Sequence, residues 1–248
     1  MTLAALRFPP NLTFESVVRS HPGRRRSINE DRVLERTAEG LWAVADGMGG
    51  HEGGDVAASR VVAALAAVQL TGSGLSRLAD IQQAMDEVNV DLLGRQTDFG
   101  SPCGSTVVAL VSFENHYACL WAGDSRAYRA RAGLLSAITH DHSLVQQLVD
   151  VGALDESGRK HHPSAHVITR AVGAVPRLEL DRQTDQIMEG DVFLLCSDGL
   201  TNCIDDGQIA HILNTQNPVQ AADHLLNRAL DQGAPDNVSL VIVRAASQ

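Results

Sequence analysis

The sequence predicts an α+β fold in which a largely antiparallel β-sandwich carries helices on its outer faces. Short apolar segments rich in β-branched residues recur along the chain, and most are bounded by Gly, Asp or Asn, as strands are. Fewer segments place apolar residues at helical spacing, and these form two pairs. Strands and helices do not alternate as βαβ units would, which favours antiparallel sheets with helices packed outside.

The same patterns place each element along the chain. We expect helices at residues 55–70, 76–93, 205–213 and 218–230, because apolar side chains there recur every three or four positions. Between residues 143 and 173 strand periodicity disappears and the chain becomes polar, so this segment is predicted to be an exposed, mobile excursion. Strands are expected at residues 14–19, 41–45, 106–113, 117–122, 192–196 and 238–243.

Composition excludes several classes of function. The chain has 248 residues, enough for a sizeable core, and its 20 basic and 30 acidic side chains give a net charge of −10. This acidity disfavours nucleic-acid binding, which depends on neutralising phosphates with Lys and Arg. Lys160 is the only lysine, and no Gly-Lys-[Ser/Thr] sequence exists, so a P-loop is excluded.

Cysteine usage and the apolar runs indicate the compartment. The four cysteines form no Cys-x-x-Cys pair, which excludes a zinc knuckle and a redox dithiol, and none is followed six positions later by the arginine of a cysteine-phosphatase cradle. Residues 1–14 do not resemble a signal peptide, and the longest apolar run, at 61–68, is far too short to span a bilayer. We therefore expect a cytoplasmic protein without membrane insertion.

Acidic residues gather at the ends of the most apolar predicted strands. Carboxylates fixed by neighbouring strands repel one another unless a cation neutralises them, and oxygen ligands suit hard ions such as Mg²⁺ or Mn²⁺. Any one Asp-Gly can be a simple turn, and Asp198 or Asp205 could instead cap a helix. The joint set nevertheless favours a site for one or two hard metal ions. Its members are Glu30, Asp31, Asp46 (followed by Gly47), Asp124, Asp198 and Asp236.

Eight short motifs in order resemble those of the PP2C-type (PPM) metal-dependent serine/threonine phosphatases, in their bacterial form. Each motif is weak alone, but eight in register over residues 14–244 are specific. They are Gly23-x-x-Arg26-x-x-Asn29-Glu30-Asp31, Ala45-Asp46-Gly47-Met48-Gly49-Gly50-His51, Gly104-Ser105-Thr106, Gly123-Asp124-Ser125-Arg126, Thr139-x-Asp141-His142-Ser143, Ile168-Thr169-Arg170-Ala171-Val172-Gly173, Ser197-Asp198-Gly199-Leu200 and Asp236-Asn237.

The resemblance implies a four-layer αββα architecture and two Mg²⁺ or Mn²⁺ ions at one end of the sandwich. It implies a single catalytic domain at 14–246, an N-terminal tail at 1–13 and a flap at about 143–173. On the matching positions, Asp46 would bridge the two ions, the Gly47 carbonyl would join the second, and Asp198 and Asp236 would complete the first. Glu30 and Asp31 would lie in or just behind the ligand shell, and Asp124 with Asp198 would hold a third, weaker ion found in some bacterial members.

The resemblance also implies a reaction without a covalent enzyme intermediate, in which a metal-bridging hydroxide attacks phosphorus in line. Arg26 can grip two phosphate oxygens as a planar fork, while Arg24 and Arg25 are interpreted as solvated surface charge. His51 either protonates the leaving oxygen or only hydrogen-bonds a metal-bound water. The histidines at 161, 162 and 166 are interpreted as exposed flap residues, and those at 140 and 142 as structural.

The leading hypothesis is a monomeric phosphatase that acts on phosphoserine and phosphothreonine proteins and opposes a cognate bacterial serine/threonine kinase. Two alternatives stay open at this stage. A pseudophosphatase would bind phosphoproteins without hydrolysing them, although such proteins usually lose metal carboxylates, which are all present here. A metal-dependent phosphoesterase acting on small substrates would use similar ions.

Overall fold

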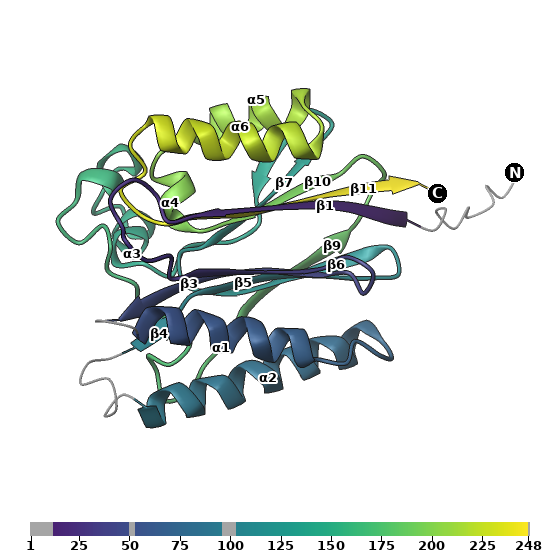
Figure 1. Ribbon diagram of the computed structural model, residues 1–248, viewed down its shortest axis with the longest axis horizontal. Helices are drawn as coiled ribbons and strands as arrows, with labels where there is room; N and C mark the ends of the chain where they lie inside the picture. The colour runs from purple at the N-terminus through teal and green to yellow at the C-terminus, as the bar shows by residue number, and fades with distance from the viewer. Residues whose placement is uncertain (1–11, 50–52, 96–102, 248) are drawn as a thin grey trace, which may run out of the picture.

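The computed structural model describes residues 12–49, 53–95 and 103–247, and it has four layers (Figure 1). Two antiparallel sheets lie face to face, with one pair of helices outside each. The α+β sandwich predicted from the sequence is therefore confirmed. Of the helices in these described ranges, none combines the length and apolarity needed to cross a membrane.

The first sheet contains the two ends of the described chain. Its strand order is β1 (Leu12–His21), β11 (Val238–Ser247), β10 (Val192–Cys196), β7 (Arg126–Arg131) and β8 (Leu134–Ala137). Helices α5 (Asp206–Thr215) and α6 (Pro218–Asp231) cover its outer face (Figure 1). The side chains of Asp205 and Asn217 accept hydrogen bonds from the first turns of these helices, so Asp205 is a helix cap.

The second sheet is built around the strand that ends in the Asp46 motif. Its order is β2 (Asp31–Arg36), β3 (Leu41–Gly49), β5 (Val107–Phe113), β6 (His116–Ala122) and β9 (Asp181–Gln186), and short β4 (Cys103–Ser105) pairs with the end of β3. Helices α1 (Gly53–Ala67) and α2 (Gly74–Arg95) cover its outer face (Figure 1).

Alternation along the central strands builds three apolar layers. In β3, Trp42 and Val44 pack between the two sheets, whereas Leu41, Ala43 and Ala45 pack against α1 and α2. A third cluster, which includes Leu194, joins the first sheet to α5 and α6. Because successive strand residues face opposite sides, a strand buried on both faces is a continuous apolar run. That is why these central strands were evident in the sequence.

All six predicted strand ranges and four predicted helices are present, and five further strands in the described residues lie outside those ranges: β2, β4, β7, β8 and β9. The missed strands are short or polar. In β7 the three arginines pair with carboxylates of other segments, Arg126 with Asp141 at 2.7 Å, Arg129 with Asp185 at 2.6 Å and Arg131 with Asp191 at 2.6 Å. Their partners lie far away in sequence, so a local apolar pattern could not reveal this strand.

The segment at 143–173 is only partly the exposed excursion that its composition predicted. It contains α3 (Leu144–Asp150), whose first turn donates to the Ser143 hydroxyl, and the 3₁₀ helix η1 (Glu156–His161). Val145 and Val172 are buried. The prediction of full exposure is wrong at these positions, because Val172 bridges Ser105 of β4 and the segment also pairs with itself, Ile168 bridging Ser143.

Candidate metal centre

The predicted acidic residues meet at one end of the sandwich. β3 and β10 end there and β2 and β11 begin there, beside the short helix α4 (Asp198–Thr201) (Figure 1). A cleft of about 450 Å³ opens at this end. Its walls include Arg26, Glu30, Asp46, Gly47, Asp124, His166, Asp198, Asn202, Asp236 and Asn237. Five of the six predicted carboxylates therefore face one cleft, and Asp31 is buried beside it at 2% exposure.

Strand register and a close backbone approach position Asp46. Asp31 lies directly opposite Asp46 in the antiparallel β2–β3 pair. The backbone N–H of Asp46 donates to the Thr106 hydroxyl at 3.1 Å, and the Thr106 N–H donates to the Asp46 carbonyl at 2.8 Å. A Cβ on Gly47 would lie 2.0 Å from the Gly54 carbonyl oxygen, so only glycine fits between β3 and α1 at this point.

The loop that carries Arg26 is attached to the turn that carries Asp236. Gly23 has φ +80°, and a Cβ there would lie 2.1 Å from the Asp236 carbonyl oxygen, so glycine permits this approach. The Arg26 guanidinium donates to Asp236 Oδ2 at 2.8 Å, although the Arg26 side chain is 52% exposed. Arg26 thus lies at the rim of the cleft, with its charge directed at a predicted metal ligand.

The buried Asn237 side chain organises the same loop and was not singled out from the sequence. Its Nδ2 donates to the carbonyls of Pro22 at 3.0 Å and Ile28 at 2.9 Å, and its Oδ1 accepts from the Glu30 N–H at 2.8 Å. The Asp-Asn pair at the start of β11 was the available signal. A buried amide that satisfies three backbone groups at once could not be inferred without knowing that the loop folds over it.

Asp198 is the first residue of α4. Its Oδ2 accepts from the Asn202 amide at 3.1 Å, one turn further along. The preceding residue, Ser197, donates through Oγ to Asp31 Oδ2 at 2.8 Å. The end of β10 therefore positions two of the predicted acids. Asp198 follows it in the chain, and Asp31 is hydrogen-bonded to the Ser197 hydroxyl.

Burial and mutual repulsion raise the pKa values of the clustered carboxyls. The pKa of Asp31 is raised to about 7 and that of Asp124 to about 8, in both cases chiefly by burial, with nearby carboxylates adding to the rise. Burial and the charges of Asp31, Asp198 and Asp124 raise the pKa of Asp46 well above its ordinary value. Burial also raises the pKa values of Asp198 and Glu30. Such a cluster favours a bound cation, which would stabilise the ionised forms.

Two orphaned atoms support the fit of the site to hard cations. Oδ1 of Asp31 and Oδ1 of Asp124 are buried and have no hydrogen-bond partner among the residues that the structure describes, an arrangement that is costly unless another group satisfies them. The donor set is made of carboxylate oxygens, as Mg²⁺ and Mn²⁺ prefer. Within the described residues, no three His, Cys, Asp or Glu side chains are already grouped around one point. The ligand set of Asp46, Asp198 and Asp236 therefore stays a prediction, and Asp236 is turned toward Arg26.

The histidine assignments change in one respect. His166 is exposed in the flap, as predicted, but it also lines the cleft with Asp46 and Asp198. Two backbone hydrogen bonds hold the segment that carries His166 beside residues 142–144. The Leu144 N–H donates to the Val167 carbonyl, and the Thr169 N–H donates to the His142 carbonyl. His51, the predicted general acid, lies outside the described residues.

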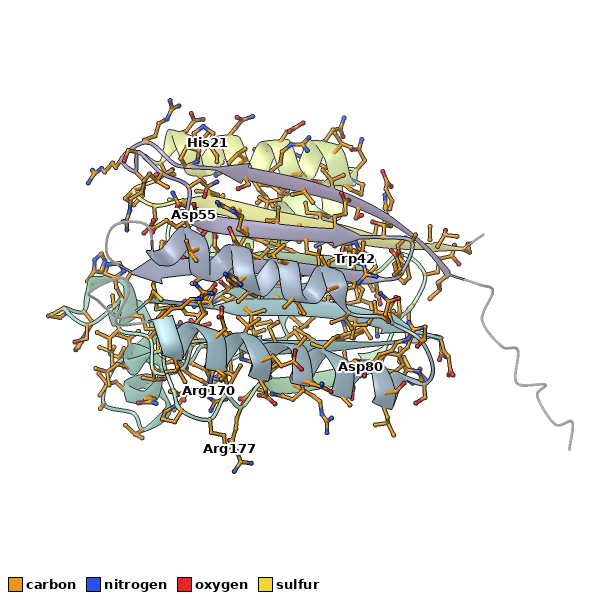
Figure 2. All side chains as sticks on the ribbon, turned by 60° about the horizontal axis from the view of Figure 1, so that its bottom comes forward. His21, Trp42, Asp55, Asp80, Arg170 and Arg177 are labelled. Carbon is orange, nitrogen blue, oxygen red and sulfur yellow. The ribbon has the colours of Figure 1, made fainter. Side chains whose placement is uncertain are left out.

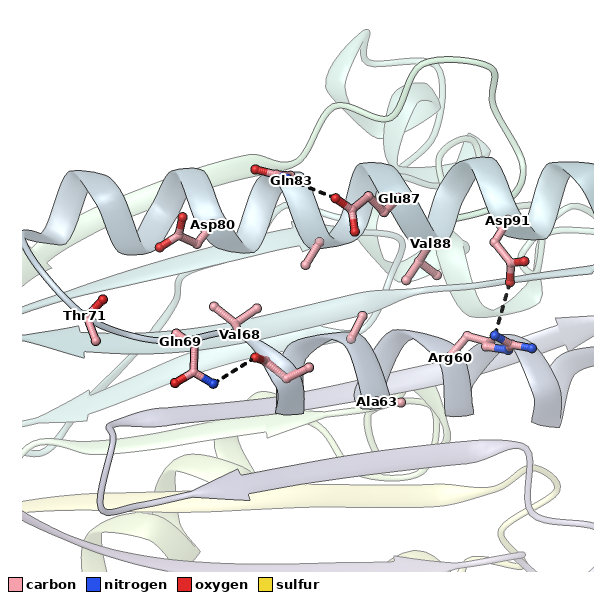
Figure 3. Close-up of a pocket in the computed structure, with 13 residues that line it drawn as sticks. Arg60, Ala63, Val68, Gln69, Thr71, Asp80, Gln83, Glu87, Val88 and Asp91 are labelled. Carbon is pink, nitrogen blue, oxygen red and sulfur yellow. Dashed lines mark hydrogen bonds and ion pairs between the residues drawn. The ribbon is translucent and has the colours of Figure 1, made fainter.

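A larger hollow of about 670 Å³ lies between α1 and α2 (Figure 3). Alanines such as Ala63 and Ala67 leave room between the helices, and Arg60 pairs with Asp91 across them at 3.6 Å. Its walls contain no histidine or cysteine, and none of the predicted site residues is among them. The acidic cleft, although smaller, is therefore the candidate site.

The sequence profile described as protein phosphatase 2C matches residues 20–234. The chain belongs to the protein phosphatase 2C family. This protein phosphatase 2C is 31% identical to the serine/threonine phosphatase stp of Listeria innocua over 236 residues, covering 91% of this chain and 93% of that protein. It is 35% identical to the serine/threonine protein phosphatase PstP of Mycobacterium tuberculosis over 234 residues, covering 93% of this chain and 45% of PstP.

Solved structures place this protein phosphatase 2C among the bacterial members of its family. PppA, described as a key regulatory component of T6SS in Pseudomonas aeruginosa, has a TM-score of 0.87 and 39% identity, with 95% of this chain and all of that chain covered. The PstP catalytic domain in complex with two manganese ions has a TM-score of 0.86 and 34% identity, with 95% of this chain and all of that chain covered. The resemblance inferred from the eight motifs is confirmed.

Proposed function

We propose that this chain is a metal-dependent phosphatase that hydrolyses phosphoserine and phosphothreonine in proteins. The observation that carries the proposal is the single cleft lined by Asp46, Asp124, Asp198 and Asp236 together with Arg26. Relatives at 31% and 35% identity over most of the chain are named serine/threonine phosphatases, which supports the same substrate class.

The cleft residues divide into metal ligands and supports. We propose that Asp46, the Gly47 carbonyl, Asp198 and Asp236 hold two Mg²⁺ or Mn²⁺ ions, that Glu30 and Asp31 support them from behind, and that Asp124 with Asp198 holds a third, weaker ion. When bound, such ions neutralise phosphoryl charge and lower the pKa of water. The relative solved with two manganese ions supports the binding of two such ions.

Arg26 is assigned to the substrate phosphate. Its planar guanidinium can donate two parallel hydrogen bonds to a phosphate dianion, which lysine cannot do. The exposed position of Arg26 at the rim of the cleft lets it reach an entering substrate. Without substrate, its guanidinium is paired with Asp236. Substrate would therefore compete with Asp236 for Arg26, which would leave Asp236 available to a cation.

Two histidines are candidates for the proton required by the departing seryl or threonyl oxygen. His51 keeps the role that its motif implies. His166 faces the same cleft from the flap and can contact the peptide that carries the phosphate. Asn237 and Thr106 are assigned to positioning, because their contacts are with the backbone around Glu30 and Asp46.

The cellular setting is also proposed. The enzyme would act as a monomer with one catalytic domain at 14–246 and a tail at 1–13, and it would oppose a serine/threonine kinase in the cytoplasm. The four free cysteines agree with a reducing compartment. The description of the Pseudomonas relative as a T6SS regulatory component makes a secretion-system kinase a specific partner to test.

The decisive experiment measures phosphate release from phosphoserine and phosphothreonine peptides with Mn²⁺. We expect turnover that EDTA abolishes and that Asp46→Asn reduces by at least about a thousandfold, because a carboxylate shared by the ions is removed. Asp185→Asn, which alters a carboxylate of β9 that pairs with Arg129 of β7 and does not line the cleft, is the matched control and should keep activity.

The same assay separates the alternatives. Tight binding of phosphopeptides without turnover would identify a pseudophosphatase. Turnover of p-nitrophenyl phosphate but of no phosphopeptide would identify a phosphoesterase for small substrates. Either result would overturn the proposed function.

A further inference from the structure

Lys160, the only lysine of the chain, extends from η1 in the flap to the end of α4. Its ammonium Nζ donates to the Thr201 carbonyl oxygen at 2.7 Å and lies 3.4 Å from the Asn202 carbonyl oxygen. The carbonyls at the C-terminal end of a helix lack intrahelical partners and carry partial negative charge, so a cation is favourable there. The contact is therefore a specific one between the flap and α4.

α4 carries a predicted metal ligand at its other end. Asp198 is its first residue, and the Asn202 side chain donates to Asp198 Oδ2 at 3.1 Å. Asn202 thus receives Lys160 through its backbone and holds Asp198 through its side chain. A connected set of contacts runs from the flap to the carboxylate at the cleft.

The body of the flap is attached elsewhere. Arg159, next to Lys160, pairs with the buried Asp141 at 2.6 Å, and Arg126 from β7 binds the same carboxylate. Between this anchor and α4 lies a hollow of about 350 Å³, with Lys160, Asp198 and Asn202 among its walls. Because a hollow separates η1 from α4, Lys160 bridges a gap rather than adding to a packed interface.

We infer that Lys160 is a positioning residue that couples the position of the flap to the metal affinity of Asp198. The inference rests on the proposed function to the extent that Asp198 binds a metal ion. When Lys160 holds α4, the Asn202–Asp198 pair is kept in one arrangement at the cleft. Coupling is reciprocal, so a metal ion that favours this arrangement must favour the docked flap by the same factor.

The first test is calorimetric titration with Mn²⁺ alone, without substrate. Lys160→Met removes the ammonium and keeps most of the length of the side chain, and we expect Mn²⁺ to bind about fivefold more weakly. Lys160→Arg retains a cation and should recover most of the affinity. Arg177→Met is the control, since Arg177 projects from the surface (Figure 2), with its side chain 88% exposed and paired only loosely with Glu179 at 3.6 Å.

The second test is hydrogen exchange of residues 151–167 within the flap, with and without Mn²⁺. We expect Mn²⁺ to slow exchange of this segment in the wild type. In Lys160→Met the segment should exchange faster without metal, and Mn²⁺ should no longer slow it. A role limited to general stability would change the exchange rate but would leave the response to Mn²⁺ intact.

A third measurement does not depend on folding of a variant. Because Lys160 is the only lysine, an amine-selective acetylating reagent applied to the folded protein modifies this side chain and the N-terminal amine alone. Acetylation should weaken Mn²⁺ binding in the wild type as Lys160→Met does. The same treatment of Lys160→Arg reports the contribution of the N-terminal amine and should have no effect.

The outcomes are distinct. Wild-type Mn²⁺ affinity in both Lys160→Met and the acetylated protein, with an unchanged flap response, would overturn the coupling and leave the proposed phosphatase intact. Failure of the wild type to bind Mn²⁺ would overturn the proposed function and this inference together.

Discussion

The side-chain oxygen of Asn237 accepts a hydrogen bond from the backbone N–H of Glu30 at 2.8 Å, across 207 positions of sequence. Through this bond, and two more from its amide to the carbonyls of Pro22 and Ile28, the start of β11 orders the loop that precedes β2. Arg26 lies in that loop and Asp236 is the neighbour of Asn237, so one buried amide determines how the proposed phosphate-binding arginine and a proposed metal ligand face each other.

Asn237→Leu should destabilise the protein by about 1–3 kcal/mol, because it removes three hydrogen bonds and leaves partly buried backbone groups unpaired. Urea unfolding of the metal-free protein measures this. Asn214→Ala, which removes an exposed amide, should change the free energy of unfolding by less than about 0.5 kcal/mol. Equal effects of the two substitutions would show that Asn237 does not order the loop.

Arg26→Ala should raise KM for a phosphopeptide by about tenfold or more and change kcat less, because the lost contact is with substrate phosphate. Arg26→Lys should recover only part of this, since the two-pronged donor is lost. Initial-rate kinetics with saturating Mn²⁺ give both constants. Arg24→Ala, two residues away and also exposed, is the control; a KM unchanged in Arg26→Ala would remove Arg26 from the substrate site.

His166→Gln should lower kcat/KM for a phosphopeptide by about tenfold while leaving Mn²⁺ affinity unchanged, because the imidazole faces the cleft but is assigned to substrate rather than metal. His161→Gln, an exposed histidine of η1, is the matched control. Phosphopeptide kinetics and Mn²⁺ titration on both variants provide the test. Loss of Mn²⁺ binding in His166→Gln would instead make His166 a metal ligand.

The stability of the metal-free protein should fall as the pH rises from about 5 to 8. The pKa of Asp31 is raised from 3.8 to about 7 and that of Asp124 from 3.8 to about 8, mainly by burial. Between the unfolded and folded values the native state binds more protons than the unfolded chain, so raising the pH favours unfolding. Thermal unfolding from pH 5 to 8 should therefore show a decreasing Tm.

Two further measurements test whether the buried carboxyls cause this decrease in Tm with pH. Asp124→Asn should flatten the dependence, because one of the groups that must lose a proton is gone. Mn²⁺ should raise Tm more at pH 8 than at pH 5, since metal ligands must be deprotonated. A Tm of the metal-free protein that rises steadily to pH 8 would contradict the raised pKa values.

Much of this protein follows from its sequence. The buried strands β3, β5, β6, β10 and β11 are continuous apolar runs, because both of their faces are covered, and α6 has a clear apolar face behind an Asn-Pro start. The acids at the ends of these strands predicted the candidate site, since a strand end is a fixed position in a sheet. The family follows from the same motifs.

The tertiary structure decided what depends on distant partners. The arginine-rich β7 forms because its cations pair with Asp141, Asp185 and Asp191, and no local pattern contains that information. His166 faces the cleft because its segment pairs with residues 142–144, and nothing in the residues beside it indicates that placement. The single lysine was evident from composition, but its reach to α4 depends on where the flap packs. Sequence records which groups are present, whereas hydrogen bonds and ion pairs formed across the fold determine which of them meet.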